Sequence, residues 1–312
     1  MNRGTILKCS HLSKHKGSFL LSDVDFELPS GYVLGVIGRN GSGKTTLMRM
    51  LLGSCMPEEG GDSFINGVSL REDVVRYKRQ VAFVLGDTPF PLLINAEACG
   101  ELYGHYYDAF DLHKYKKLLQ EFEVPQKAML IRLSKGQMIR QQLAFALSYR
   151  ANLYLFDEPT ANLDVDFRDE FHKYVRQITA REDAGVVYVS HLVDELEQFA
   201  DYILWLSTGR EDPTRKTTTR VSLQRYFATM DSLRERFQLI ESSREEVPDI
   251  RDENIVGVRA GKHHQEMLVQ VDREQLPDEI QGVSRYASLK ELMYYIETGG
   301  EPDEAGVERT ES

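Results

Sequence analysis

Short apolar runs and helix-like segments alternate along the first two hundred residues of the chain. Residues 32–38 form an uninterrupted apolar run that predicts a buried strand, and residues 45–52 have the spacing of an amphipathic helix, closed by Gly53 and Pro57. Further β-type patterns occur at 5–8, 24–28, 81–85, 153–156, 186–189 and 202–206. Because strands that alternate with helices build parallel sheets, this pattern predicts a largely parallel α/β sheet.

The alternation is interrupted once and ends near Gly209. Between residues 89 and 149 the β pattern gives way to helical spacing, most clearly at 112–122 and 137–149, which predicts an inserted helical subdomain. A polar, threonine-rich stretch follows Gly209, and short helical and strand-like pieces come after it. We therefore predict a main domain over 1–209, a small α+β domain over 210–298 and a disordered, acidic tail over 299–312.

Composition excludes several classes of function. A net charge of -11 over 312 residues disfavours a nucleic-acid partner, which would require clustered Lys and Arg side chains. No apolar run approaches the roughly 20 residues of a membrane-spanning helix, and the N-terminal stretch lacks the apolar core of a secretory signal. These features predict a cytosolic protein. The three cysteines have no metal-ligand spacing and are assigned no chemistry.

The strongest chemical motif is the glycine-rich stretch Gly38-Arg-Asn-Gly-Ser-Gly-Lys-Thr45, which lies between the predicted strand and helix. This is the pattern and position of a loop that binds phosphate groups through inward-pointing backbone N–H groups and the positive end of the following helix. Lys44 is expected to contact the β- and γ-phosphates, and the Thr45 hydroxyl is expected to bind Mg²⁺. The predicted nucleotide-binding residues are Gly38, Asn40, Gly41, Ser42, Gly43, Lys44, Thr45 and Thr46.

Two adjacent carboxylates end the apolar run at 153–156. In this position Asp157 would face the magnesium ion, and Glu158 would act as the general base that polarises the water attacking the γ-phosphate. Taken alone, the same residues would more often belong to an ordinary buried strand with a solvated acidic turn. The phosphate-binding motif upstream favours the catalytic interpretation.

On these motifs and their order, the sequence resembles an ATP-binding cassette ATPase from the N-terminus to about Leu206. Leu133-Ser-Lys-Gly-Gln137 is similar to the signature loop of that family and opens a predicted helix. The resemblance implies that Ser134, Gly136 and Gln137 contact the ATP held by the opposite subunit of a dimer. Without its neighbours, this pentapeptide would be interpreted as a helix N-cap by Ser134.

Two further positions gain a role from the resemblance. Thr160-Ala-Asn-Leu-Asp164 is similar to the loop that communicates across the dimer, so Asp164 is expected at the ATP of the opposite subunit. His191 follows an apolar strand as the family's switch histidine does, although a lone histidine in such a position is usually structural. The resemblance implies that His191 contacts the γ-phosphate beside Glu158, with ATP and Mg²⁺ as cofactors.

Two departures from the family pattern concern the positions that bind the metal ion and the adenine ring of ATP. Gly86 stands where the family usually has a glutamine ligand to Mg²⁺, and the adjacent Asp87 either replaces that ligand or caps the turn before Pro89. Lys16 stands where an aromatic ring usually stacks on adenine, and Phe19 and His15 are the candidates to take over this contact. The third signature residue is Lys135 instead of glycine, which leaves Ser134 and Gly136 in place.

Within the family, the sequence resembles the ATPase subunits of bacterial drug, antimicrobial-peptide and lipid exporters of the bacitracin-resistance type. The resemblance lies in the LSKGQ loop, in the segment 102–111 and in the apolar spacing at 289–296, which marks either the core of the small domain or a dimer contact. It implies a homodimer or a dimer with a paralogous ATPase subunit, bound to a transmembrane permease on the inner face of the cell membrane.

Two alternative functions remain. One is a regulatory subunit that binds ATP but hydrolyses it weakly within a heterodimeric transporter, as the departures at Gly86 and Lys16 indicate. The other is a cassette protein without a transport role that acts on ribosomes or DNA. The single phosphate loop, the absence of a heptad run and the acidic balance of the chain disfavour the second alternative.

Overall fold

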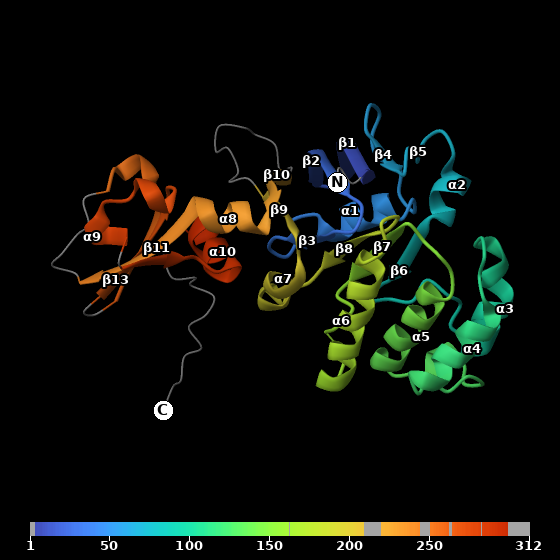
Figure 1. Cartoon of the computed structure of the whole chain (residues 1–312). Coiled ribbons are helices and arrows are strands. Elements are labelled where there is room, and N and C mark those ends of the chain that lie inside the picture. The colour runs from blue at the N-terminus through green and yellow to red at the C-terminus, as the bar shows by residue number, and fades with distance from the viewer. Residues whose placement is uncertain are drawn as a thin grey trace. The chain divides into compact units, whose positions relative to one another are not determined.

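The computed structural model describes residues 4–161, 163–208, 220–243, 250–261, 264–281 and 283–298. Its contacts divide the chain into two compact units: one contains the residues up to His191 together with Ala200–Phe227, and the other contains Leu192–Phe199 and the residues from Ala228 on (Figure 1). The tail predicted over 299–312 lies outside the described residues. No helix in the described part of the chain has the length and apolar character needed to cross a lipid bilayer.

The first unit is built on one mixed sheet, which has ten strands among the described residues, in the order β5-β4-β1-β2-β10-β9-β3-β8-β7-β6. Strands β3, β6, β7, β8 and β9 pair in parallel, whereas β1, β2, β4 and β5 pair antiparallel. The α/β class is as predicted, but the antiparallel part is larger than expected. The strand bounds are β1 Thr5–Lys16, β2 Phe19–Pro29, β3 Val33–Ile37, β4 Asp62–Ile65, β5 Val68–Ser69, β6 Val81–Val84, β7 Leu153–Asp157, β8 Gly185–Val189, β9 Tyr202–Thr208 and β10 Arg220–Thr229.

Strands β1 and β2 are longer than the patterns at 5–8 and 24–28 indicated. Their pairing is shifted after Cys9 and again after Leu12, and His11 and Asp23 have positive φ values of 49° and 54°. Such irregularities interrupt the period-two alternation of buried and exposed residues. The sequence pattern therefore revealed only the regular part of each strand.

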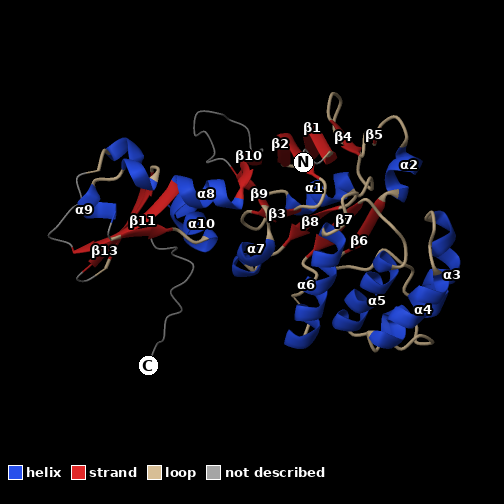
Figure 2. Cartoon of the chain, viewed as in Figure 1, coloured by secondary structure: helices blue, strands red, loops and turns tan. Residues whose placement is uncertain are grey.

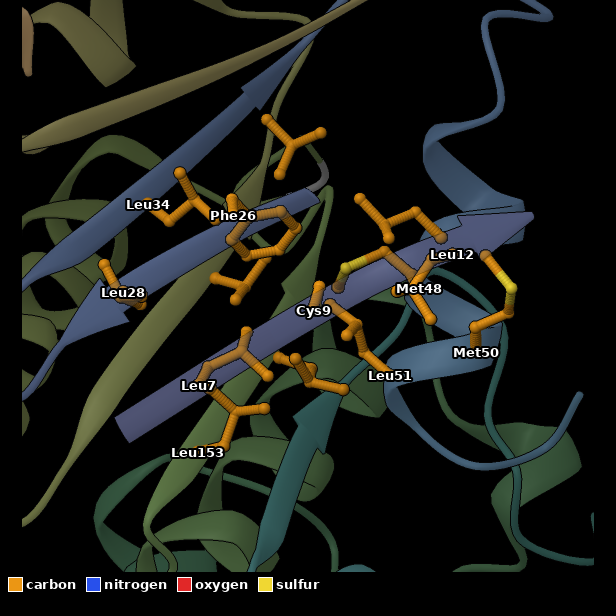
Figure 3. Close-up of a cluster of buried hydrophobic side chains, with 14 of the residues drawn as sticks. Leu7, Cys9, Leu12, Phe26, Leu28, Leu34, Met48, Met50, Leu51 and Leu153 are labelled. Carbon is orange, nitrogen blue, oxygen red and sulfur yellow. The ribbon is translucent and has the colours of Figure 1, made fainter. Parts of the chain in front are cut away.

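Helix α1 (Lys44–Leu51) anchors the glycine-rich loop to the core of this unit. Its Met48, Met50 and Leu51 side chains are buried among side chains of β1 and β2, including Leu7 and Phe26 (Figure 3). Full burial of one such side chain contributes roughly 1.5–3 kcal/mol. The loop at the start of α1 is thus attached to a closely packed layer.

The predicted helical insertion consists of three helices and two short 3₁₀ turns, which Figure 2 shows beside the strands of the first unit. Its core is aromatic: the rings of Phe110 and Phe145 lie 4.9 Å apart between centroids, and Tyr115 is buried beside them. The Tyr115 hydroxyl donates to the Ala96 carbonyl at 2.7 Å, which links two of the helices. The bounds are α3 Ala96–Tyr103, α4 Leu112–Glu121 and α5 Lys135–Leu147, with turns at Gly104–Tyr106 and Leu130–Arg132. Helices α2 (Val74–Arg79) and α6 (Val165–Thr179) complete the unit.

The second unit is a small α+β structure around an antiparallel sheet in the order β12-β13-β11-β14. The pattern at 289–296 lies in α10, whose Leu289, Leu292 and Tyr295 are buried within this unit. It therefore contributes to the unit's own core. The bounds are α7 Val193–Phe199, α8 Met230–Arg236, β11 Phe237–Ser243, β12 Ile255–Ala260, β13 His264–Gln270, α9 Asp278–Gln281, β14 Ser284–Tyr286 and α10 Leu289–Thr298, with 3₁₀ turns at Asp252–Asn254 and Arg273–Gln275.

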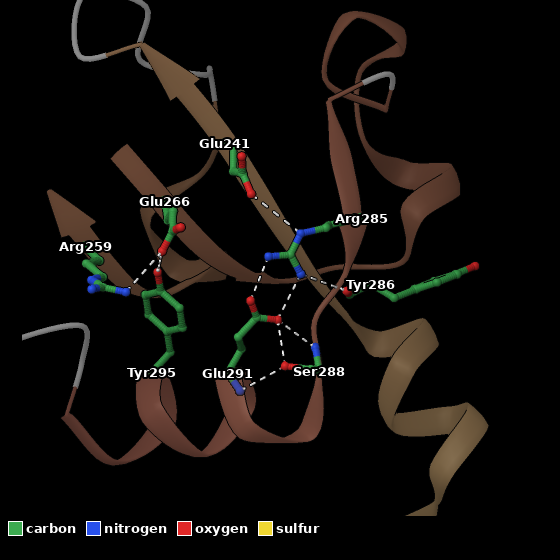
Figure 4. Close-up of polar contacts among 8 residues, drawn as sticks. All are labelled: Glu241, Arg259, Glu266, Arg285, Tyr286, Ser288, Glu291 and Tyr295. Atoms are coloured by element: carbon green, nitrogen blue, oxygen red, sulfur yellow. Dashed lines mark hydrogen bonds and ion pairs between the residues drawn. The ribbon is translucent and has the colours of Figure 1, made fainter. Parts of the chain in front are cut away.

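A polar network closes β14 onto α10 in the second unit. Arg285 binds Glu291 through two nitrogen atoms at 2.7 and 2.9 Å, and Glu291 also accepts from the N–H and hydroxyl of Ser288, each at 2.8 Å (Figure 4). Beside it, the Tyr295 hydroxyl donates to Glu266 at 3.0 Å. Every oxygen of Glu291 thus has a partner.

The border between the two units lies later than the sequence indicated. We predicted it at 209/210, from the change in composition after Gly209. Strand β10 nevertheless pairs in parallel with β2, with Arg220 opposite Phe19, so residues up to Phe227 belong to the first unit. Because the stretch before β10 is polar, the sequence did not predict that the chain adds another strand to the first sheet.

Candidate functional site

The glycine-rich loop joins β3 to α1 at the carboxyl edge of the parallel strands. Gly38, Gly41 and Gly43 have φ values of 147°, 82° and 93°, a backbone region that disfavours other residues. A Cβ at Gly38 would lie 2.2 Å from the Leu206 carbonyl oxygen, so no side chain fits there. Position 38 therefore requires glycine for space as well as for conformation.

Lys44 and Ser222 hold the loop in place. The Lys44 ammonium is buried and donates to the carbonyl oxygens of Gly38 at 2.5 Å and Arg39 at 3.2 Å. The hydroxyl of Ser222, on β10, donates to the Ser42 carbonyl at 2.6 Å. The phosphate-binding loop is thus supported by a strand 180 residues further along the chain.

Glu158 and His191 come together where β7 and β8 end. The two strands are parallel neighbours with Asp157 opposite Val189, and the Glu158 N–H donates to the Val189 carbonyl at 2.9 Å. This arrangement places Glu158 Oε1 3.3 Å from His191 Nε2. Glu158 also has a positive φ of 52°. This backbone conformation is uncommon for glutamate and costs free energy.

Burial dominates the electrostatics of both acids. Burial raises the pKa of Asp157, and the positive charge of Lys44 partly offsets this effect. Burial likewise raises the pKa of Glu158, against a hydrogen bond from the His191 backbone, and the neighbouring Asp157 charge adds to the rise. Among the described residues, Glu158 Oε1 accepts no hydrogen bond. A carboxylate in such surroundings is a suitable proton acceptor.

These groups surround a single cavity of about 540 Å³. Its wall includes every predicted catalytic and nucleotide-binding residue except Gly38, which instead accepts from Lys44. Lys16 and Phe19 also line it, whereas His15, the other candidate for the base contact, does not. The predicted residues in the wall are Asn40, Gly41, Ser42, Gly43, Lys44, Thr45, Thr46, Asp157, Glu158 and His191.

A second hollow of about 420 Å³ brings Asp87 to the metal candidates. Thr45, Asp87 and Asp157 all line it. At Pro89 itself, the Thr88 hydroxyl accepts from the Phe90 N–H at 3.3 Å. Among the described residues no hydrogen bond occupies the Asp87 carboxylate, which leaves this group available to a cation.

Sequence reasoning missed Gln142, which fixes the chain just before Gly86. Its side-chain amide accepts from the Leu85 N–H and donates to the Leu85 carbonyl, both at 3.0 Å. The buried side chain lies on α5, the helix that begins at the signature-like loop. This pairing depends on tertiary packing, and the sequence carries no local signal for it.

The signature-like loop uses its polar groups within the chain. The Ser134 hydroxyl accepts from the Gln137 N–H at 3.1 Å, and the Gln137 side chain accepts from the Ser134 N–H at 3.0 Å, which forms a capping box at the start of α5. The N-cap interpretation of Ser134 is therefore realised. Its hydroxyl proton is still available to a ligand, because among the described residues the hydroxyl takes part only in the bond from the Gln137 N–H, which it accepts.

Asp164 is likewise engaged locally. It caps α6 by accepting from the Phe167 N–H at 2.8 Å, and it pairs with Arg140. The Phe167 bond is the main cause of its lowered pKa. Among the described residues, neither hollow is lined by the predicted contacts to an opposite ATP, namely Ser134, Gly136, Gln137 and Asp164.

Arg220 also lines the cavity, although no sequence pattern pointed to it. It is the first residue of β10, follows a polar threonine-rich stretch and reaches the cavity wall through the pairing of β10 with β2. Ser18, whose carbonyl accepts from the Arg220 N–H at 2.7 Å, lines the same wall. No local motif marks either residue.

Known proteins resemble the chain in sequence and in fold. The family model described as ABC transporter matches residues 21–161. The chain is 32% identical to the Escherichia coli aliphatic sulfonates import ATP-binding protein SsuB over 67% of this chain and 80% of that protein. It is 27% identical to the Bacillus subtilis ABC transporter ATP-binding protein YtrB, over 61% of this chain and 64% of that protein.

Other relatives and the solved structures extend the comparison. The chain is 29% identical to the Vibrio parahaemolyticus molybdenum import ATP-binding protein ModC. The match covers 60% of this chain but only 52% of ModC. The ATP-binding subunit of an ABC transporter superposes with a TM-score of 0.63 at 23% identity, covering 74% of this chain and 92% of that chain. A dimeric post-hydrolysis cassette bound to ADP and Pi superposes with a TM-score of 0.59 at 18% identity, covering 72% of this chain and 98% of that chain. These two structures share the fold.

Proposed function

The chain belongs to the ATP-binding cassette family of ABC transporters, and from this premise we propose that it binds and hydrolyses ATP to drive a separate transmembrane exporter. The observation that carries the proposal is the convergence of the Lys44 loop with Glu158 and His191 around one cavity of about 540 Å³. Relatives that import molybdenum or sulfonates share the family. Export of a drug, peptide or lipid therefore rests on the sequence resemblance at LSKGQ, 102–111 and 289–296.

Nucleotide binding would use the loop as a preformed cradle. The glycines leave the backbone N–H groups of the loop accessible, and α1 contributes its positive end. Lys44 would exchange its two carbonyl acceptors for the β- and γ-phosphate oxygens, which are stronger partners because they are charged. The hydroxyls of Thr45 and Thr46 lie in the same wall.

Hydrolysis would proceed with Glu158 as general base. As the water oxygen bonds to the γ-phosphorus, a proton passes to the Glu158 carboxylate, and the bond from that phosphorus to the bridging oxygen breaks to give ADP and phosphate. His191, 3.3 Å away, would orient the water and contact the γ-phosphate. Burial of the carboxylate supports this role because it raises the affinity of Glu158 for a proton.

The residues between the two hollows fit a magnesium ion. Mg²⁺ prefers oxygen ligands, and the Thr45 hydroxyl and the Asp157 carboxylate line both hollows. These two residues would hold the ion, with Asp87 as the candidate to replace the family's glutamine. When bound, Mg²⁺ would neutralise charge on the phosphate oxygens.

A complete site would require two chains facing head to tail. Ser134, Gly136, Gln137 and Asp164 belong to neither hollow of their own chain, so they would act on the ATP of a partner, either a second copy or a paralogous subunit. The Ser134 hydroxyl and the Gly136 N–H at the start of α5 are suitable donors to a γ-phosphate. ATP would thus stabilise the dimer, and hydrolysis would release it.

The helical insertion would receive the membrane subunit on the inner face of the membrane. Leu93 and Ile131 are 74% and 57% exposed, and their segments are joined by a hydrogen bond from the Ile131 N–H to the Leu92 carbonyl. Met129 is exposed as well, and we propose that a cytoplasmic helix of a permease covers these apolar side chains. We expect Leu93→Asp to abolish stimulation of ATP hydrolysis by the permease without changing the basal rate.

A regulatory subunit with weak hydrolysis is the second candidate. The observation that favours it is Gly86, which leaves the position of the usual magnesium ligand without a side chain. The rate of ATP hydrolysis, measured for the purified chain alone and with its paralogous partner, distinguishes an active ATPase from a regulatory subunit. A chain that binds ATP but hydrolyses it only weakly even with its partner would be regulatory.

The proposal is tested by gel filtration of Glu158→Gln with ATP. The variant should elute as a dimer with ATP and as a monomer with ADP, because hydrolysis no longer separates the chains. Adding Ser134→Ala to Glu158→Gln should restore the monomer, since the second contact to ATP is lost. A monomer for Glu158→Gln at saturating ATP would contradict a self-dimerising ATPase.

A further inference from the structure

Part of the wall of the nucleotide cavity is formed by residues that the family motifs do not include. Lys16 stands where the resemblance leads one to expect an aromatic ring, and Arg220 lies in the same wall. Lys44, Lys16 and Arg220 together give the cavity three cationic side chains, against the carboxylates of Asp157 and Glu158. A ligand that carries several negative charges would balance this wall.

The position of Arg220 is set by the sheet. Its N–H donates to the Ser18 carbonyl at 2.7 Å, and it lies directly opposite Phe19 in the parallel pairing of β10 with β2. Two residues later, Ser222 is buried and donates to the Ser42 carbonyl at 2.6 Å. The strand that carries Arg220 is therefore attached directly to the phosphate-binding loop.

The guanidinium group lies against the loop itself. A Cβ built at Gly41 would lie 3.2 Å from Nη1 and 3.7 Å from Cζ of Arg220. The missing side chain at Gly41 is what allows this close approach. Among the described residues no carboxylate forms an ion pair with Arg220, and its guanidinium group lies beside Gly41 of the loop.

We propose that Arg220 is a nucleotide-binding residue of this chain, whose guanidinium group donates to phosphate oxygens of ATP from outside the glycine-rich loop. Arginine suits this role because its planar donors match phosphate oxygens and remain charged at any physiological pH. The ring of Phe19, which a Cβ at Gly43 would meet at 3.0 Å, provides an apolar surface next to it. The inference rests on the proposed ATP binding and adds a phosphate contact to it.

The test compares two arginines on the same strand. Arg225 is also exposed on β10, but its guanidinium lies 6.0 Å from the Tyr226 ring centroid and does not line the cavity. Affinity for fluorescently labelled ATP and ADP is measured for the wild type, Arg220→Gln, Arg220→Lys and Arg225→Gln. We expect Arg220→Gln to raise the Kd about tenfold. Arg220→Lys should recover part of the loss, and Arg225→Gln should stay within about twofold of the wild type.

Inorganic tripolyphosphate, used as a competitor, isolates the phosphate contact. Arg220→Gln should weaken its competition by a similar factor, whereas a loss confined to ATP would place Arg220 at the base or ribose and overturn the assignment. Equal ATP affinity of Arg220→Gln and wild type would also overturn it, and would leave the proposed function intact. A wild type that binds no ATP would instead overturn the proposed function. Thermal unfolding shows whether each variant is folded, and Arg220→Lys provides the comparison if the glutamine variant is not.

Discussion

Glu158 in the first unit and Glu291 in the second are both partly buried carboxylates, but their surroundings shift their pKa values in opposite directions. Burial raises the pKa of Glu158, and one of its oxygens accepts no hydrogen bond from the described residues. Glu291 has its pKa lowered to about 2, chiefly by Arg285, because the two residues form a double hydrogen bond (Figure 4). The folded protein thus disfavours the charged form of Glu158 and favours the charged form of Glu291.

The difference separates a reactive group from a structural one. A carboxylate whose hydrogen bonds are complete, as in Glu291, stabilises the fold and has a low affinity for protons. A desolvated carboxylate with an unoccupied oxygen, as in Glu158, costs stability and has a raised affinity for protons. On this basis the chemistry is expected in the first unit, and the following predictions test the contrast.

The largest effect is expected on hydrolysis. Glu158→Gln removes the proton acceptor, so the rate of phosphate release should fall at least about 100-fold while ATP still binds. Glu121→Gln is a matched control, since among the described residues Glu121 forms an exposed ion pair with Lys117 at 3.4 Å and no other. A Glu158→Gln rate within a few-fold of the wild type would remove Glu158 from the mechanism.

The next effect concerns stability in the second unit. Glu291→Gln leaves Arg285 without its main partner, and we expect the free energy of unfolding to fall by about 1 kcal/mol, after allowance for the solvent exposure of the pair. The rate of ATP hydrolysis should not change. Chemical denaturation measures the loss, and Glu253→Gln is the control, because the Arg251–Glu253 pair is 83% and 72% exposed. Equal stability of Glu291→Gln and wild type would make the network irrelevant to the fold.

The pH dependence of this effect has a defined sign. The pKa of Glu291 is lower in the folded protein than the value of roughly 4.3 in an unfolded chain, so its contribution is present above about pH 4.5 and is lost as the pH falls toward 2. The stability difference between wild type and Glu291→Gln should therefore shrink over this window. A difference that stays constant from pH 5 to pH 2.5 would refute the ion-pair explanation.

The smallest expected effect is a gain in the free energy of unfolding when Glu158 in the first unit is replaced, in contrast to the loss expected for Glu291→Gln. Because the pKa of Glu158 is raised in the fold, its ionisation destabilises the folded state at neutral pH. Glu158→Gln should therefore raise the free energy of unfolding without nucleotide by roughly 0.5–1 kcal/mol. Thermal and denaturant unfolding near pH 7.5 measure this change, and a loss of stability would show that Glu158 is a structural residue.

Local motifs made the phosphate-side residues predictable. Lys44, Asp157 and Glu158 each lie at the end of a strand or the start of a helix that its own neighbours specify. The capping pair Ser288 and Glu291 also carried a local signal, since Ser288 directly precedes a helix and Glu291 follows it three positions later, in the first turn.

Residues whose positions depend on tertiary pairing were not predictable. Arg220 reaches the cavity only because β10 pairs with β2, and its sequence neighbours are polar. Gln142 binds Leu85 across 57 residues, and the bulged pairing of β1 with β2 interrupts the alternation that marks a strand. In each case a contact between segments far apart in the sequence, and not the local pattern, decides the position.

If the cavity around Lys44 binds ATP for hydrolysis, the purified chain should release phosphate from ATP. The rate is measured against ATP concentration with Mg²⁺, for the wild type and for Lys44→Ala. We predict saturable turnover by the wild type and loss of turnover in Lys44→Ala, because the charge that holds the β- and γ-phosphates is gone. Equal rates for the two proteins would contradict the account.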